Sequence, residues 1–185
     1  MKLECFKAYD IRGRLGDQLN DEIAYRIGRA YARMLSPRAV AVGGDIRLTS
    51  APLKAALAQG LMDGGSDVID LGVTGTEEVY FAAFHLDVDG GIEVTASHNP
   101  MDYNGLKMVR AGSAPLDAET GLAAIKALAE ADAFGPARPG GTHRDIAKDA
   151  RAAYVTQVLR FVDIAALKPL KIVVNAGHGT AGPTF

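Results

Sequence analysis

The chain has 185 residues, 48% of them hydrophobic and 23% charged, a composition typical of a folded globular protein and not of a disordered one. Its 20 basic and 22 acidic side chains are spread along the whole length, and the net charge of -2 argues against a nucleic-acid partner. Cys5 is the only cysteine, which excludes an internal disulfide and a cysteine-rich metal cluster.

Nothing in the sequence has the features of a secretory signal or a membrane span. Residues 1–4 are not followed by the apolar segment that a signal peptide needs. The uninterrupted apolar runs are far shorter than the ~20 residues that cross a bilayer. We therefore expect a cytoplasmic protein with no membrane partner.

The first clear element is a helix between Asn20 and the pair Ser36-Pro37. Asn20 is a good capping residue, and the acidic residues after it suit the first turn of a helix. Apolar side chains then recur at helical spacing until the Ser-Pro pair ends the pattern. These apolar side chains are Ile23, Ile27, Tyr31 and Met34.

The chain then alternates between short β-branched segments and amphipathic ones. We expect strands over residues 39–42, 67–71, 91–95 and 106–109, and helices from Thr49 or Ser50 to Gly64-Gly65, from 77 to 86 with Thr76 as the cap, and from 117 to 131. This alternation predicts an α/β fold, a three-layer α/β/α sandwich with a mixed sheet.

The composition changes at residues 134–141, where three glycines and two prolines predict an exposed linker and a domain boundary. Beyond it we expect one helix over 149–161 and one strand over 170–175. A single helix and strand cannot bury their own apolar faces. We therefore expect a first domain over 1–145 and the truncated opening of a second α/β domain over 146–185.

Residues 95–103 leave the carboxyl end of a predicted strand, which is where open α/β sheets bind their ligands. Ser97 offers a hydroxyl nucleophile and His98 a hydrogen-bond donor. Arg12 and Lys107 add positive charge if the fold brings them to this loop. Each of these residue types is more often structural when it stands alone, but together they would suit an anion.

The spacing of these residues resembles that of the α-D-phosphohexomutase family. The segments TASHNP at 95–100 and DYNGLK at 102–107 are similar to the phosphoserine loop of that family, and FKAYDIRG at 6–13 is similar to its amino-terminal motif. The segments GGDIRLTS at 43–50 and GTEEVYF at 75–81 resemble the bacterial phosphomannomutases within the family. The resemblance covers essentially the whole chain, as the amino-terminal part of such an enzyme.

This resemblance implies the interconversion of mannose 6-phosphate and mannose 1-phosphate, a step toward GDP-mannose. It implies that Ser97 carries the transferred phosphate, with hexose 1,6-bisphosphate as the intermediate and activator, and that Mg²⁺ binds through the phosphate on Ser97. Arg12 and Lys107 are then candidates for proton transfer and substrate binding. Since an arginine is a poor base, Lys107 is the better candidate for proton transfer. Phosphoryl transfer depends chiefly on positioning and electrostatics, so cations should surround the serine.

The resemblance also assigns supporting roles. It implies that His98 is one of the basic groups near the phosphate and that Tyr9 and Asn104 contact the substrate. The partners would be small sugar phosphates. We further expect residues after about 165 to be poorly ordered or to pack on a neighbouring chain, so that the truncated second domain supports self-association.

Parts of that enzyme are missing from this chain: the loop of three aspartates that holds the metal, the sugar-reading loop and the phosphate-gripping loop. The chain alone is therefore expected to be incomplete and inactive. Two alternatives stay open, a non-catalytic folded or interacting unit of mutase ancestry, and a preference for glucose phosphates.

Three other patterns are weaker. Asp87 and Asp89 alternate like metal ligands but lack a third carboxylate. Residues 177–182 fit a dinucleotide-binding glycine turn, although we expect no helix after it. No glycine motif of a serine hydrolase surrounds Ser97, and a base rarely points at the hydroxyl of its own neighbour. His85 and His143 have no partner at a recognisable spacing.

Overall fold

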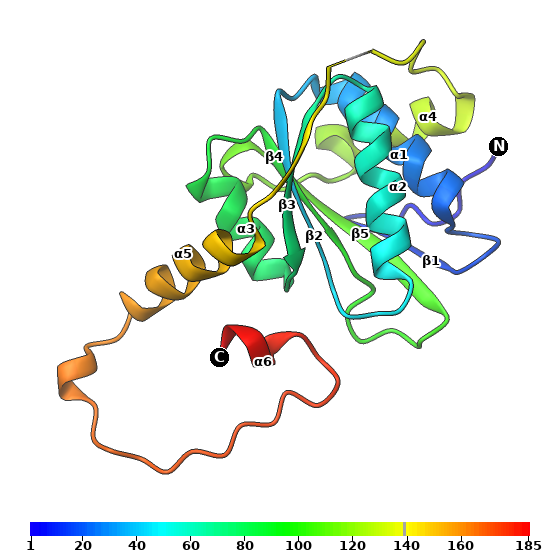
Figure 1. Cartoon of the computed structure of the whole chain (residues 1–185). Helices are drawn as coiled ribbons and strands as arrows, with labels where there is room; N and C mark the ends of the chain where they lie inside the picture. The colour runs from blue at the N-terminus through cyan, green and yellow to red at the C-terminus, as the bar shows by residue number, and fades with distance from the viewer. Residues whose placement is uncertain (139) are drawn as a thin grey trace.

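A computed structural model describes residues 1–138 and 140–185 of the chain. In these residues one mixed sheet runs through the molecule in the order β1-β5-β4-β2-β3-β6 (Figure 1). The strands are β1 (Ile11–Arg14), β2 (Ala39–Gly44), β3 (Asp67–Val73), β4 (Gly90–Val94), β5 (Tyr103–Arg110) and β6 (His143–Asp145). The pairs β2–β3, β2–β4 and β3–β6 are parallel, whereas β5 runs antiparallel to both β1 and β4.

Helices cover both faces of the sheet, which confirms the three-layer sandwich (Figure 1). One face carries α1 (Asp21–Leu35), α2 (Ser50–Asp63) and α4 (Ala123–Ala131), and the larger hydrophobic cluster lies beneath them. The other face carries α3 (Thr76–His85) and α5 (Ala147–Leu159) over a smaller cluster. Strands β2 and β3 contribute side chains to both clusters, because side chains of a strand alternate between the two faces of the sheet.

The helix α1 begins and ends where its sequence predicts. The side chain of Asn20 accepts a hydrogen bond from the backbone nitrogen of Ile23 at 3.0 Å, and Ser36 closes the helix in the left-handed conformation. The buried residues Ile23, Ile27 and Tyr31 face the core. A capped amphipathic helix against a sheet is thus present as expected.

Two glycines allow α1 and α2 to pack in direct backbone contact. A Cβ atom on Gly28 would collide with the carbonyl oxygen of Leu57, and one on Gly60 would collide with that of Tyr25. The close approach of the two helices therefore depends on the absence of side chains at these two crossing points.

Two helix predictions need correction. The cap of α3 is Gly75 and not Thr76, because the Glu78 side chain reaches back to the Gly75 nitrogen at 2.7 Å. The helix predicted over 117–131 is broken at Gly121, whose φ of 150° no right-handed helix accommodates, so that a separate turn precedes α4.

The predicted linker leads back into the first sheet. Of residues 134–141, Pro139 lies outside the described residues, and most of the others are exposed. The short strand β6 follows and pairs with β3, where the His143 Nε2 atom lies 3.1 Å from the Asp70 carboxylate. His143 therefore has a partner on another strand, which its sequence spacing did not reveal. The division at 145/146 stays a prediction.

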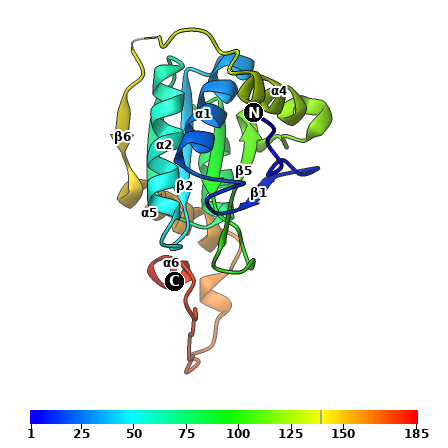
Figure 2. The ribbon, with the colours of Figure 1, turned by 90° about the vertical axis from the view of Figure 1, so that its right-hand side faces the viewer.

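The segment after α5 extends away from the sheet and its helices and then turns back toward them (Figures 1 and 2). The strand predicted over 170–175 is wrong, because these residues pair with no other strand and lie exposed. A strand needs a neighbour to receive its backbone hydrogen bonds, and the described chain offers none here. The expectation that no helix follows the glycine turn was also wrong, since α6 (Ala181–Thr184) forms there.

None of the helices in the described residues combines the length and the apolar character that crossing a membrane requires.

Candidate active site

The loop that carries Ser97 starts where the parallel strand β4 ends, at the same edge of the sheet as the carboxyl ends of β2 and β3. Ser97 is exposed and has a φ of 54°, a left-handed conformation that is uncommon for serine. Asn99 folds the loop back, since its backbone nitrogen and its side-chain amide both donate to the Ala96 carbonyl, at 3.0 and 2.8 Å. The predicted loop tip is therefore present.

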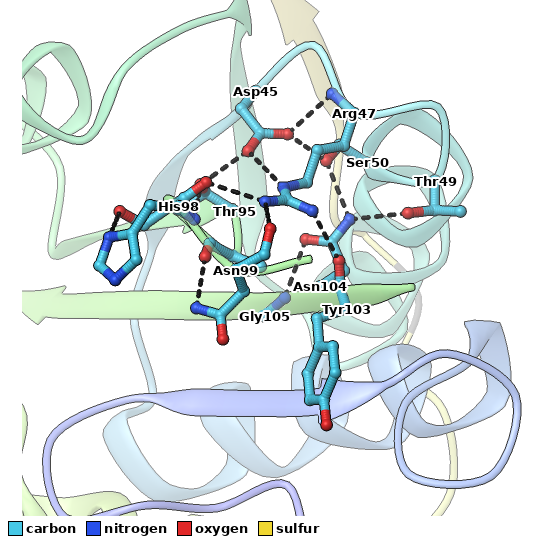
Figure 3. A network of polar contacts seen from close by, with 12 residues as sticks. Asp45, Arg47, Thr49, Ser50, Thr95, His98, Asn99, Tyr103, Asn104 and Gly105 are labelled. Atoms are coloured by element: carbon cyan, nitrogen blue, oxygen red, sulfur yellow. Dashed lines mark hydrogen bonds and ion pairs between the residues drawn. The ribbon is translucent and has the colours of Figure 1, made fainter. Parts of the chain in front are cut away.

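A chain of polar contacts ties this loop to the end of β2 (Figure 3). The Ser97 backbone nitrogen donates to the Thr95 hydroxyl at 2.9 Å, and that hydroxyl donates to the Asp45 carboxylate at 2.7 Å. The other oxygen of Asp45 accepts from the hydroxyl of Ser50, the first residue of α2, at 2.5 Å. Asp45 thus joins the loop after β2, the start of α2 and the Ser97 loop.

Arg47 contacts the same loop with its guanidinium group (Figure 3). Its terminal nitrogens donate to four backbone carbonyl oxygens, those of Ser97 at 2.8 Å, Asn99 at 2.5 Å, Pro100 at 2.9 Å and Tyr103 at 3.1 Å. Its Nε atom lies 3.5 Å from Asp45. Both Asp45 and Arg47 lie in the segment 43–50 that resembles the mutases, but no pattern in the sequence indicated their contacts with a loop 50 residues away.

The predicted cations come from the two strands beside the loop. Arg12 of β1 is paired in register with Gly105 of β5, and Lys107 follows two residues later on the same face of the sheet. The Arg12 guanidinium is bound to Asp10 at 2.7 Å. In the described residues no hydrogen bond joins either cation to Ser97, so the structure brings them to neighbouring strands without direct contact.

The remaining predicted residues have different surroundings. Tyr9 is 80% exposed. The His98 Nδ1 atom lies 3.3 Å from the Ser97 Oγ atom, so this histidine does point at its neighbour's hydroxyl, contrary to our expectation. Asn104 is fully buried, and its amide donates to the hydroxyls of Thr49 and Ser50 at 2.9 and 3.0 Å. Its predicted contact with substrate stays a prediction, while its present contacts hold the start of α2 against β5.

Glu93 is a buried carboxyl group behind the loop that the sequence analysis did not single out. It has no exposed surface, one oxygen accepts from the Thr74 hydroxyl at 2.7 Å, and the other has no partner in the described residues. The pKa of Glu93 is raised to about 8, chiefly by burial and in addition by the negative charge of Asp45, against the opposing effect of the Thr74 hydrogen bond. Gly43 on the neighbouring strand leaves room for this side chain, because a Cβ atom there would collide with both Thr74 and Glu93.

An open hollow of about 700 Å³ lies over these residues. The loop after β2, the Ser97 loop and the glycine turn near the end of the chain line it, with Asp45, Ser97, Asn99, His178 and Thr180 among its residues. A hollow of this volume is of a size that holds small-molecule ligands.

The described residues do not form a magnesium site on their own. No group of three or more histidine, cysteine, aspartate or glutamate side chains in them is placed to hold a metal. The alternating pair Asp87 and Asp89 has another explanation, since both carboxylates bind Arg38, at 3.2 and 3.5 Å. The carboxylate of Asp45, which contacts the loop, is occupied by hydroxyl groups and Arg47.

Comparison with known proteins gives a consistent match. Residues 3–135 match the family model described as phosphoglucomutase/phosphomannomutase, alpha/beta/alpha domain I. A phosphomannomutase of Salmonella typhimurium is 59% identical over 186 residues, covering 100% of this chain and 40% of the relative. A phosphomannomutase of Klebsiella pneumoniae is 62% identical over 147 residues, covering 78% of this chain and 94% of the relative.

A solved structure supports the same assignment. A phosphoglucomutase/phosphomannomutase family protein from Burkholderia thailandensis superposes with a TM-score of 0.82 at 37% identity, over 97% of this chain and 40% of that one. The chain belongs to the phosphoglucomutase/phosphomannomutase family. It is similar to the amino-terminal part of bacterial phosphomannomutases and spans about 40% of the length of the Salmonella relative.

Proposed function

We propose that this chain supplies the phosphate-carrying domain of a phosphomannomutase, which interconverts mannose 6-phosphate and mannose 1-phosphate. The single observation that carries the proposal is the position of Ser97, exposed at the tip of a loop at the carboxyl edge of the sheet and beside an open hollow. The names of the relatives, phosphomannomutase in Salmonella and in Klebsiella, favour mannose over glucose phosphates.

In this proposal the Ser97 hydroxyl holds the phosphoryl group, gives it to the sugar and receives one back from the hexose 1,6-bisphosphate. Lys107 is the candidate that moves the proton of the attacking hydroxyl, because a lysine amine can act as a base and a guanidinium cannot. Arg12, with Tyr9 near it in sequence, would bind the sugar phosphate from β1. His98, whose ring nitrogen already lies beside the Ser97 oxygen, would hydrogen-bond the phosphate.

Magnesium would bind the phosphate oxygens on Ser97 and neutralise charge there. Since the described residues contain no cluster of metal-binding side chains, the protein ligands for it would come from outside this chain. The same holds for the groups that read the sugar. We accordingly expect this chain alone to accept phosphate but not to complete a turnover.

The proposal is tested by incubating the chain with glucose 1,6-bisphosphate and Mg²⁺ and measuring its intact mass. We expect one phosphate to be added to the wild type and none to Ser97→Ala. Ser113→Ala is a matched control, because Ser113 also has a left-handed backbone, with a φ of 61°, but lies away from the loop. A wild-type chain without an adduct, or an adduct that persists in Ser97→Ala, contradicts the proposal.

The alternative is a folded unit of mutase ancestry without catalysis. It is favoured by one observation, that the described residues contain no group of metal-binding side chains. Adding the remaining part of such a relative to the phosphorylated chain and assaying mannose 1-phosphate conversion separates the two. Turnover supports a missing part, whereas a phosphorylated chain that never turns over supports the alternative. A parallel assay with glucose 1-phosphate decides between the two sugars.

A further inference from the structure

The side chain of Arg47 makes contacts that the proposed reaction does not by itself require. A guanidinium group carries five N–H donors in a flat, rigid arrangement. In this structure four of them meet backbone carbonyl oxygens of one loop between Ser97 and Tyr103, and the Nε atom faces Asp45. A cationic donor strengthens each of these hydrogen bonds relative to a neutral one.

These contacts leave Arg47 no donor with which to bind a phosphate group. Its charge is also balanced by Asp45, and the two side chains are only 18% and 16% exposed. Arg47 therefore differs from the cations expected around a phosphoserine. It binds the backbone of the loop that carries the serine.

The residue that most needs such support is Ser97. A left-handed backbone is unfavourable for a residue with a side chain, so a loop free of restraint would relax to other conformations. Both peptide groups of Ser97 are restrained in the structure: its nitrogen donates to Thr95, and its carbonyl oxygen accepts from Arg47. Thr95 and Arg47 in turn both contact Asp45.

We propose that Arg47, held by Asp45, is a positioning residue that keeps Ser97 in its left-handed conformation and so presents the hydroxyl for phosphoryl transfer. This inference rests on the proposed function for its catalytic consequence, but the restraint on the loop exists without phosphate. A lysine cannot replace Arg47, because a single ammonium group with three donors cannot span four carbonyl oxygens spread over seven residues.

The test compares Arg47→Lys with the wild type by two measurements. Hydrogen exchange reports the loop through the amides of Ser97, Asn99 and Tyr103, which are hydrogen-bonded within it. Intact mass over time reports the rate of phosphate uptake from glucose 1,6-bisphosphate. We expect loop exchange to become faster, and phosphate uptake slower, each by roughly tenfold or more, as misplacement of a reacting group would cause.

The matched control is Arg29→Lys. Arg29 is a buried arginine of α1 that donates to the Gly135 carbonyl and the Tyr25 hydroxyl, far from the loop. Loss of a buried arginine there should lower the melting temperature while leaving loop exchange and phosphate uptake unchanged. A second variant, Arg47→Ala, is assayed with added guanidinium ion against sodium chloride of the same concentration. Guanidinium should restore part of the phosphate uptake.

The outcomes separate this inference from the proposed function. Slow uptake in Arg47→Lys with unchanged loop exchange means that Arg47 acts on the phosphate directly, which overturns the positioning role. Fast loop exchange with wild-type uptake overturns it as well. If the wild type itself takes up no phosphate, the proposed function fails, and hydrogen exchange alone then decides whether Arg47 restrains the loop.

Discussion

Among single residues, two carboxyl groups at the carboxyl edge of the sheet, Asp45 and Glu93, have different surroundings. Asp45 accepts hydrogen bonds from two hydroxyl groups and contacts Arg47, whereas one oxygen of Glu93 has no partner in the described residues. Taking an unpaired carboxylate out of water is costly, so the neutral form of Glu93 is favoured in the folded protein.

Glu93 makes the stability of the protein depend on pH. In the unfolded chain its pKa is near 4.5, and in the folded protein it is about 8, so between these values only the folded state binds the proton. The free energy of unfolding should therefore fall as the pH rises through this window, by about 1.4 kcal/mol per unit from this group. Glu93→Gln, which stays neutral, should lose that slope and gain stability relative to the wild type at pH 8.

Urea denaturation at pH 5, 6.5 and 8 measures this effect. The control is Glu77→Gln, an exposed residue of α3 that should leave the pH dependence of the wild type unchanged. A pH slope that is the same in Glu93→Gln and in the wild type would mean that Glu93 is ionised in the folded protein.

Among the helices, α2 packs closely against α1 and begins at the candidate site. Ser50 opens α2 and donates to Asp45, while Asn104 of β5 binds the hydroxyls of Thr49 and Ser50. Hydrogen bonds therefore join the start of α2 both to the sheet and, through Asp45, to the Ser97 loop.

The contact between these helices can be tested at Gly60. Gly60→Ala should destabilise the protein by about 1–3 kcal/mol, because the added methyl group must displace the Tyr25 carbonyl, even though alanine favours a helix over glycine by about 1 kcal/mol. Chemical denaturation measures the change. Gln59→Ala, on the exposed side of α2, is the control and should have little effect. An unchanged midpoint in Gly60→Ala would show that the helices can separate without cost.

The molecule as a whole consists of the packed α/β/α sandwich and an exposed segment after α5. Apolar side chains of that segment lie exposed, with Leu170, Ile172 and Val173 at 77%, 65% and 92%. The segment returns to the body where the Thr184 hydroxyl meets the Glu78 carboxylate at 2.9 Å. Exposed apolar residues in an unpaired segment favour association with another chain, which is our proposal for self-association.

Hydrogen exchange and sedimentation of the wild type test this proposal together. Amides of residues 170–175 should exchange quickly at low protein concentration, whereas those of the central strand β2 should exchange slowly. With rising concentration the sedimentation coefficient should increase and exchange over 170–175 should slow. Slow exchange in a proven monomer contradicts the proposal. Replacing Ile172 with lysine should abolish the association, and replacing Met101, which is 87% exposed on the Ser97 loop, serves as the control.

The α/β alternation and the loop of Ser97 can be predicted from the sequence, because the periodicity of apolar residues, the caps and the turn at Asn99 are local patterns. The roles of Ser97, Lys107 and Arg12 in catalysis are predictions of the family resemblance that the structure leaves open. Four further facts appear only in the folded structure: Arg47 binds the Ser97 loop from 50 residues away, Glu93 is buried with one oxygen unpartnered in the described residues, β6 joins the sheet, and residues 170–175 form no strand. These four facts depend on which segments become neighbours, and a side chain that binds distant backbone atoms leaves no periodic pattern in the sequence.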